Sequence, residues 1–161
     1  MPTKTQRVSF DTCAMAMCYT VALRATCRHR EQGAVIFKDR RVISCGYNGA
    51  PPGIKNCLER GFCSKAKGLP CLAEGLHGES NAIITAARLG ISVEGATLYC
   101  IYSPCRVCAN MIKTAGITEV VYESVYDGFP EGPAYLKYLG IKVCTSGPPG
   151  EDIYEITHKE N

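Results

Sequence analysis

Tryptophan is absent from this sequence, phenylalanine occurs only four times, and neither sign of charge dominates. The 18 lysines and arginines and the 15 acidic residues leave a formal net charge of +3. Proteins that bind a polynucleotide usually combine a basic channel with stacking aromatic side chains, so we expect no nucleic-acid partner. No apolar run approaches the roughly 20 residues that a membrane-spanning helix needs, so we expect no membrane partner either.

A secretion signal is also missing from the first residues. Residues 1–10 include Lys4 and Arg7 and lead into Asp11, with neither an apolar run nor a cleavage site. We therefore expect a cytoplasmic location. Eleven cysteines would suggest a disulfide scaffold in a small secreted domain. In a reducing cytoplasm, and with a Cys-x-x-Cys pair present, metal binding is the better interpretation.

Length and apolar pattern predict one α/β domain over residues 1–161. Apolar residues at helical spacing predict helices over 9–25, 77–89, 104–115 and 133–139. Short β-type runs predict strands over 34–37, 42–45, 97–102, 120–122 and 141–144, the first two forming a hairpin. Residues 46–75 predict a long ordered loop, which usually carries function or a metal clip. This order predicts a central mixed five-stranded sheet with helices on its faces.

Two motifs open the second and third predicted helices: His-Gly-Glu at 77–79 and Pro-Cys-Arg-Val-Cys at 104–108. Crossovers bring helix N-termini to one edge of a sheet, and residues three apart share a helical face. We therefore expect His77, Cys105 and Cys108 to reach one metal ion. Three protein ligands leave a fourth tetrahedral position open, as in catalytic zinc sites. The alternative is a structural zinc site or a reduced cysteine pair.

Glu79 lies two residues after His77, near the predicted metal but in the wrong place to complete a tetrahedron. A carboxylate there can take a proton from water and deliver it to a substrate. Alternatively, Glu79 stabilises the first turn of its own helix through the helix dipole.

These motifs together are similar to the signature of zinc-dependent nucleobase deaminases, and residues 27–143 resemble the deoxycytidylate deaminase family. One departure is Gly78, where the family usually has alanine. Free-nucleoside cytidine deaminases usually have cysteine at the His77 position, and tRNA adenosine deaminases match the cysteine-rich loop less well. The matching stretches are 33–36, 46–53, 75–83, 95–99 and 103–105.

The resemblance implies a three-layer α-β-α cytidine-deaminase-like fold, a catalytic zinc ion, and hydrolytic deamination of dCMP to dUMP for thymidylate synthesis. Family members are commonly homohexamers that dCTP activates and dTTP inhibits, so these effectors and a homo-oligomer are implied as well. By similarity, Asn48 hydrogen-bonds the sugar, or else it is a turn residue beside Gly49. Tyr126 aligns with a tyrosine near the pyrimidine, although an isolated aromatic side chain is as often packing.

The phosphate of such a substrate needs cationic or backbone donors. Arg28 and Arg30 are candidates because a guanidinium fork fits phosphate, and Arg30 lies nearest a basic position of the family. A solvated surface is an equal alternative for so short a basic cluster. Arg106, inside the Cys-x-x-Cys pair, could also face the site, and the sequence leaves this open.

The turn after Asn48 is a candidate effector site. Glycine at Gly49 and Gly53 permits close approach of phosphates, and Pro52 stiffens the turn. A nucleotide bound there could therefore displace Asn48. The alternative is a simple connection between a strand and the loop.

A second zinc site is implied by some relatives, in which the cysteines matching Cys27 and Cys57 are among the ligands. Cys63 or Cys71 could complete it, and a long loop with little apolar content gains most from such a clip. The alternative is several free thiols, because the loop spacing departs from the family after Cys57.

Two rival functions remain open. The nearer rival is a deaminase of dCTP, of both nucleotides, or of a base within RNA, and the composition speaks against the last. The rival from another class is a non-catalytic zinc-stabilised binding module, which has no reason to keep Glu79 beside the ligands.

Overall fold

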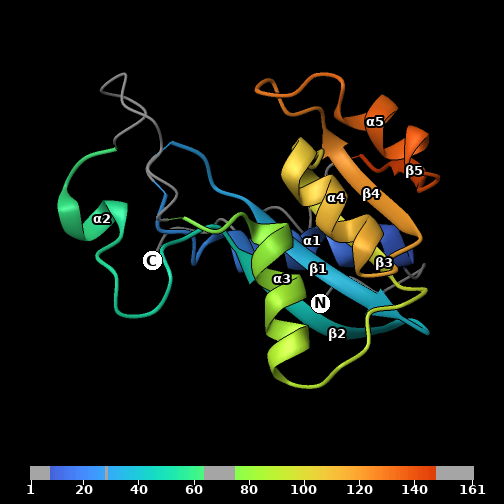
Figure 1. The fold of residues 1–161 in the computed structure, drawn as a ribbon, viewed down its shortest axis with the longest axis horizontal. Coiled ribbons are helices and arrows are strands. Elements are labelled where there is room, and N and C mark those ends of the chain that lie inside the picture. The colour runs from blue at the N-terminus through green and yellow to red at the C-terminus, as the bar shows by residue number, and fades with distance from the viewer. Residues whose placement is uncertain (1–7, 28, 64–74, 148–161) are drawn as a thin grey trace, which may run out of the picture.

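The computed structural model describes residues 8–27, 29–63 and 75–147, and Figure 1 shows how their elements are arranged. None of the helices in these ranges is long and apolar enough to cross a membrane. The elements are α1 (Phe10–Ala22), β1 (Gly33–Lys38), β2 (Arg41–Tyr47), α2 (Cys57–Arg60), α3 (Gly78–Arg88), β3 (Thr97–Tyr102), α4 (Arg106–Thr114), β4 (Glu119–Ser124), α5 (Gly132–Tyr138) and β5 (Lys142–Thr145).

The strands form one mixed sheet in the order β2-β1-β3-β4-β5. β1 is antiparallel to both β2 and β3, whereas β3, β4 and β5 run parallel. Antiparallel neighbours can be joined by a tight turn, and Asp39 and Arg40 form it with φ values of 50° and 61°. Parallel neighbours need a crossover, which α4 and α5 provide. The predicted hairpin and mixed five-stranded sheet are therefore confirmed.

Helices cover both faces of the sheet, which gives three layers. Residues of α3, α4 and α5 pack on one face and residues of α1 on the other, and Figure 1 shows α3 and α4 in front of the sheet and α1 behind it. Successive strand residues alternate between faces. In β1, Ala34 and Ile36 accordingly join the first core, whereas Val35 and Phe37 join the second. The expected α-β-α layering is confirmed.

The first helix begins as predicted and ends early. The Ser9 side chain caps α1 by accepting a hydrogen bond from the backbone N–H of residue 12. The helix ends at Ala22, not at residue 25, because the N–H groups of Arg24 and Ala25 bond three residues back and that of Thr26 donates to the Asn48 carbonyl at 3.1 Å. A long-range backbone bond thus replaces the last predicted turn.

The loop expected over 46–75 contains a helix, α2, that the sequence analysis missed. Asn56 and Glu59 form a capping box at its start, and their spacing was the overlooked signal. Residues 64–74 lie outside the described part of the chain. A second correction concerns Pro104, which precedes the helix instead of opening it, because Cys105 is the extended N-cap residue of α4.

Candidate active site

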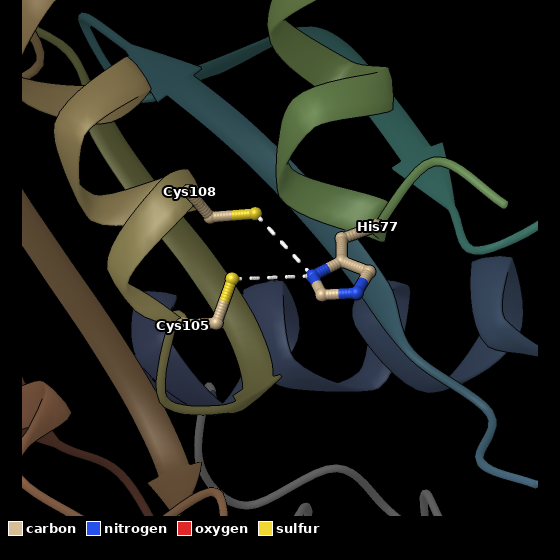
Figure 2. Close-up of side chains that lie close together, drawn as sticks. All are labelled: His77, Cys105 and Cys108. Carbon is tan, nitrogen blue, oxygen red and sulfur yellow. Dashed lines mark hydrogen bonds between the residues drawn. The ribbon is translucent and has the colours of Figure 1, made fainter. Parts of the chain in front are cut away.

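Two helix N-termini meet at the candidate site. His77 is the N-cap residue of α3, Cys105 is that of α4, and neither makes a side-chain capping bond. Cys108 lies in the first turn of α4, on the same side as Cys105 (Figure 2). The crossover from β3 therefore delivers both thiols to the start of α3, as the spacing predicts.

The three predicted metal ligands converge on one point. His77 Nδ1 lies 3.4 Å from Cys105 Sγ and 3.5 Å from Cys108 Sγ, and Figure 2 shows the three side chains pointing toward one another. Their ligand atoms all lie within 4.8 Å of one another. Within the described residues, no other group of three metal-binding side chains is this close.

The two thiols affect each other's ionisation. The hydrogen bond between them lowers the pKa of Cys105 to about 4, against the effect of burial, and His77 lowers it further. The same hydrogen bond, together with burial, raises the pKa of Cys108. A divalent cation binds cysteine sulfurs as thiolates, so its binding would displace any proton that they carry. One nitrogen and two sulfurs fit a tetrahedral zinc ion with one open position.

Glu79 is buried beside this group, with 2% of its surface exposed. Its Oε1 accepts a hydrogen bond from Gln32 Nε2 at 3.2 Å, and Cys108 Sγ donates to its Oε2 at 3.9 Å. Burial raises the pKa of its carboxyl, although its own backbone N–H and His77 act in the opposite direction. The carboxylate thus stands between the predicted metal ligands and a buried amide, and its catalytic role stays a prediction.

Gln32 is a site residue that the sequence analysis missed. It is buried, and besides Glu79 its side chain bonds the backbone of Tyr102. The sequence offers one signal, a polar residue directly before the buried strand β1. Nothing in its spacing connects it with Glu79, which lies 47 positions later.

Asn48 is buried and tied to the backbone before β1. Its Oδ1 accepts from Gln32 N–H at 2.8 Å, and its Nδ2 donates to Arg30 O at 2.6 Å. These bonds are long-range, which a simple turn residue would not make. An amide still has a second hydrogen and a second lone pair, so hydrogen bonding to a sugar stays a prediction.

Arg30 lies between two tyrosine rings. Its guanidinium carbon is 4.5 Å from the Tyr102 ring centre and 4.9 Å from that of Tyr126, and Nη2 pairs with Asp127 at 2.8 Å. These contacts hold the Arg30 side chain in place, so Arg30 does not fit the alternative of a solvated surface residue. Arg28, the other phosphate candidate, lies outside the described residues.

Arg106 belongs to a different cluster. Its guanidinium carbon lies 4.9 Å from the Phe129 ring centre and 4.5 Å from that of Tyr135. The side chain thus packs on the rings of Phe129 and Tyr135, and a role for Arg106 in the site stays open.

The turn after Asn48 is joined to the chain before the metal site. Gly49 and Leu76 exchange two backbone hydrogen bonds of 2.9 and 3.1 Å, and Leu76 directly precedes His77. Pro52 and Gly53 are exposed, and Gly53 has a φ of 85°, which favours glycine. An effector role for this turn stays a prediction.

The cysteines proposed for a second metal do not gather among themselves in the described residues. Cys27, Cys57 and Cys63 are all described, but they form no group of three ligand atoms. Cys71 lies outside the described residues. A second zinc site is thus left as a prediction that depends on Cys71.

Comparisons with known proteins point in one direction. Residues 8–124 match the model of the cytidine and deoxycytidylate deaminase zinc-binding region. The chain is 36% identical to a deoxycytidylate deaminase of Schizosaccharomyces pombe over 155 residues, which cover 92% of this chain and 47% of that protein. It is 34% identical to the deoxycytidylate deaminase of Enterobacteria phage T2 over 165 residues, covering 80% and 88% of the two chains. The chain thus spans about half the length of its fission-yeast relative.

A solved structure extends this likeness to three dimensions. The crystal structure of dCMP deaminase from the cyanophage S-TIM5, in complex with dCMP and dUMP, is similar with a TM-score of 0.77 and 27% sequence identity. The likeness covers 88% of this chain and 99% of that one. The mixed sheet and its helical layers are therefore those of that enzyme.

Proposed function

Because this chain belongs to the cytidine and deoxycytidylate deaminase family, we propose that it removes the amino group of dCMP by hydrolysis and yields dUMP. One observation carries the proposal: a His–Cys–Cys group that could hold a metal ion adjoins a buried carboxylate. The relatives that bear this name support the substrate, as do the dCMP and dUMP bound to the S-TIM5 enzyme.

In this proposal His77, Cys105 and Cys108 hold a zinc ion, which lowers the pKa of a water molecule to about 7. Glu79 moves the protons. Its carboxylate accepts one proton from the attacking water and delivers it to the pyrimidine ring nitrogen. It then takes the second proton of that water from the hydroxyl group on the ring carbon and gives it to the amine, which leaves as ammonia. Burial raises the pKa of the Glu79 carboxyl, which favours its protonated form as the donor to the substrate.

The test is an assay of ammonia release from dCMP, dCTP, deoxycytidine and cytidine by the purified, zinc-loaded protein. We expect dCMP to have the highest kcat/KM. Preferred turnover of dCTP would favour the triphosphate deaminase instead. No release from any of the four would overturn the proposal and favour the non-catalytic binding module.

We also propose that Arg30 binds the 5′-phosphate. The two tyrosine rings and Asp127 hold its guanidinium in place, and a charged hydrogen bond contributes about 1.5–3 kcal/mol. Arg30→Gln should therefore lower kcat/KM for dCMP by roughly tenfold to over a hundredfold, and leave that for deoxycytidine unchanged. Arg40→Gln is a matched control, because Arg40 also lies over an aromatic ring, that of Phe10, but in the β1–β2 turn. Equal losses for both substrates would contradict the phosphate role.

Regulation is proposed at the turn formed by Gly49, Pro52 and Gly53, with dCTP as activator and dTTP as inhibitor. The turn adjoins Asn48, and the Gly49–Leu76 backbone pair leads directly to His77. A nucleotide that shifts the turn could therefore move either Asn48 or His77. We expect a sigmoidal dCMP curve that dCTP makes hyperbolic, with a coupling of about 1–3 kcal/mol. A hyperbolic curve that ignores both triphosphates would contradict this regulation and leave the deaminase activity standing.

The remaining proposals concern assembly and context. We propose a cytoplasmic homohexamer that supplies dUMP for thymidylate synthesis, and a second zinc ion held by Cys27, Cys57 and Cys71. Light scattering tests the assembly. Elemental analysis tests the metal, with two zinc ions per chain expected and Cys57→Ser reducing this to one. One zinc ion in both proteins would contradict the second site.

A further inference from the structure

A buried amide holds one oxygen of Glu79. Gln32 is 7% exposed, and its Nε2 donates to Glu79 Oε1 at 3.2 Å and to Tyr102 O at 3.1 Å. Its Oε1 accepts from Tyr102 N–H at 3.1 Å. The side chain thus joins the end of β3 to the first turn of α3; its bond to Glu79 is buried, and its two bonds to Tyr102 are partly buried.

The direction of this amide is fixed by the backbone. A Tyr102 N–H can only donate, so the oxygen of the amide must face it and the NH₂ group must face Glu79. Gln32 is therefore a donor to the carboxylate. Because Oε1 is held by Gln32, Oε2 is the oxygen nearer to Cys108 Sγ, at 3.9 Å. The carboxylate is kept from rotating away from the predicted metal ligands.

The glycine at position 78 leaves space for this side chain. A Cβ built on Gly78 would lie 3.0 Å from Gln32 O, 3.3 Å from Gln32 Cγ and 3.3 Å from Gly46 O, which is closer than most real contacts of this kind. The backbone of Gln32 cannot easily give way, because its N–H and C=O both bond Asn48. An added methyl group would therefore press on two backbone carbonyl oxygens as well as on the Gln32 side chain.

We propose that Gln32 is a positioning residue for Glu79, and that Gly78 helps by leaving room for the Gln32 side chain. Gln32 directs the carboxylate oxygen that exchanges protons, without being needed to hold the metal. This inference rests on the proposed deaminase function, with Glu79 as the group that carries the proton.

Replacement of Gln32 tests the positioning. Gln32→Met keeps the length of the side chain and removes all three bonds. We expect kcat for dCMP to fall by about tenfold or more, the scale of a hydrogen bond to a charged group, with KM and zinc content unchanged. Ser44→Ala is the control, because it removes a buried 2.7 Å bond between β2 and α3 that does not involve Glu79. A zinc-loaded Gln32→Met protein with wild-type kcat would overturn the proposal, and so would an equal kcat loss in Ser44→Ala.

A double-mutant comparison tests the partnership with Gly78. Gly78→Ala should lower kcat by about tenfold when Gln32 is present. In a Gln32→Ala background, where Cγ is gone, the same change should cost less than about twofold, because the positioning bond is already lost. Equal, additive losses in the two backgrounds would show that the glycine acts through something else.

Failure of the proposed function is distinguishable from failure of this inference. Should the wild-type protein turn over no cytosine nucleotide, the deaminase proposal fails, and a crystal structure of Gln32→Met still decides the positioning. We expect the Glu79 carboxylate to rotate in that variant. An unchanged carboxylate there would overturn the role of Gln32 independently of activity.

Discussion

Replacement of Glu79 by glutamine separates proton transfer from metal binding. The variant keeps the shape of the side chain: its amide oxygen can take the place of Oε1 and accept from Gln32 Nε2, now 3.2 Å away. Its amide nitrogen then takes the place of Oε2 beside Cys108. Glu79→Gln therefore removes the charge and the proton acceptor and leaves His77, Cys105 and Cys108 in place.

Two quantities measured on Glu79→Gln test this separation: the turnover of dCMP and the free energy of unfolding. General acid–base catalysis contributes about a hundredfold to ten-thousandfold, so turnover of dCMP should fall at least about a hundredfold, equivalent to about 2.7 kcal/mol of activation free energy. The free energy of unfolding should not fall together with the turnover rate. Burial disfavours the ionised carboxyl and raises its pKa, so a neutral amide removes a desolvation cost. The free energy of unfolding should equal that of the wild type or exceed it.

The assay measures ammonia release, zinc content and urea unfolding on the same preparation. Glu94→Gln is the matched control, because this exposed glutamate lies in the turn before β3 and outside the candidate site. It should retain wild-type turnover. Near-normal turnover in a zinc-loaded Glu79→Gln protein would refute the mechanism, and a loss of zinc equal to the loss of rate would show that Glu79 holds the metal instead.

Three further predictions address the metal, the core and pH. Cys108→Ala should lose zinc by elemental analysis, whereas Cys100→Ala, which removes an equally buried thiol outside the metal group, should keep it. Leu98→Ala, at a fully buried position of β3, should lower the free energy of unfolding in urea by about 2–5 kcal/mol, and a loss below about 1 kcal/mol would contradict the assignment of this core. Burial alone would raise the pKa of Glu119, but hydrogen bonds, first that from Lys142, hold it below its usual 4.5. The stabilisation by ionised Glu119 is therefore present above pH 4.5 and lost as the pH falls through the lowered pKa. The Tm difference between wild type and Glu119→Gln should accordingly shrink between about pH 5 and pH 3. A constant difference would contradict this.

Family membership and the metal site could be read from residues close together in sequence. The resemblance to the deaminase family is confirmed by the family match over residues 8–124. The convergence of His77, Cys105 and Cys108 also followed from short motifs, because each motif opens a helix and helix N-termini meet at one edge of such a sheet. Strands and helices were recognised for the same reason: their periodicity is local.

The surroundings of those ligands were decided by contacts that no local pattern contains. Gln32 directly precedes β1, and Glu79 lies in the first turn of α3, far away in sequence. Only the packing of α3 on the sheet brings the amide to the carboxylate. The helix α1 ends earlier than predicted because Thr26 bonds Asn48. Arg106 packs against an aromatic ring of α5. Motif spacing determines which groups can share a metal ion. The hydrogen-bond partners of a buried side chain depend on which distant segments the fold packs against it, and only the tertiary structure supplies them.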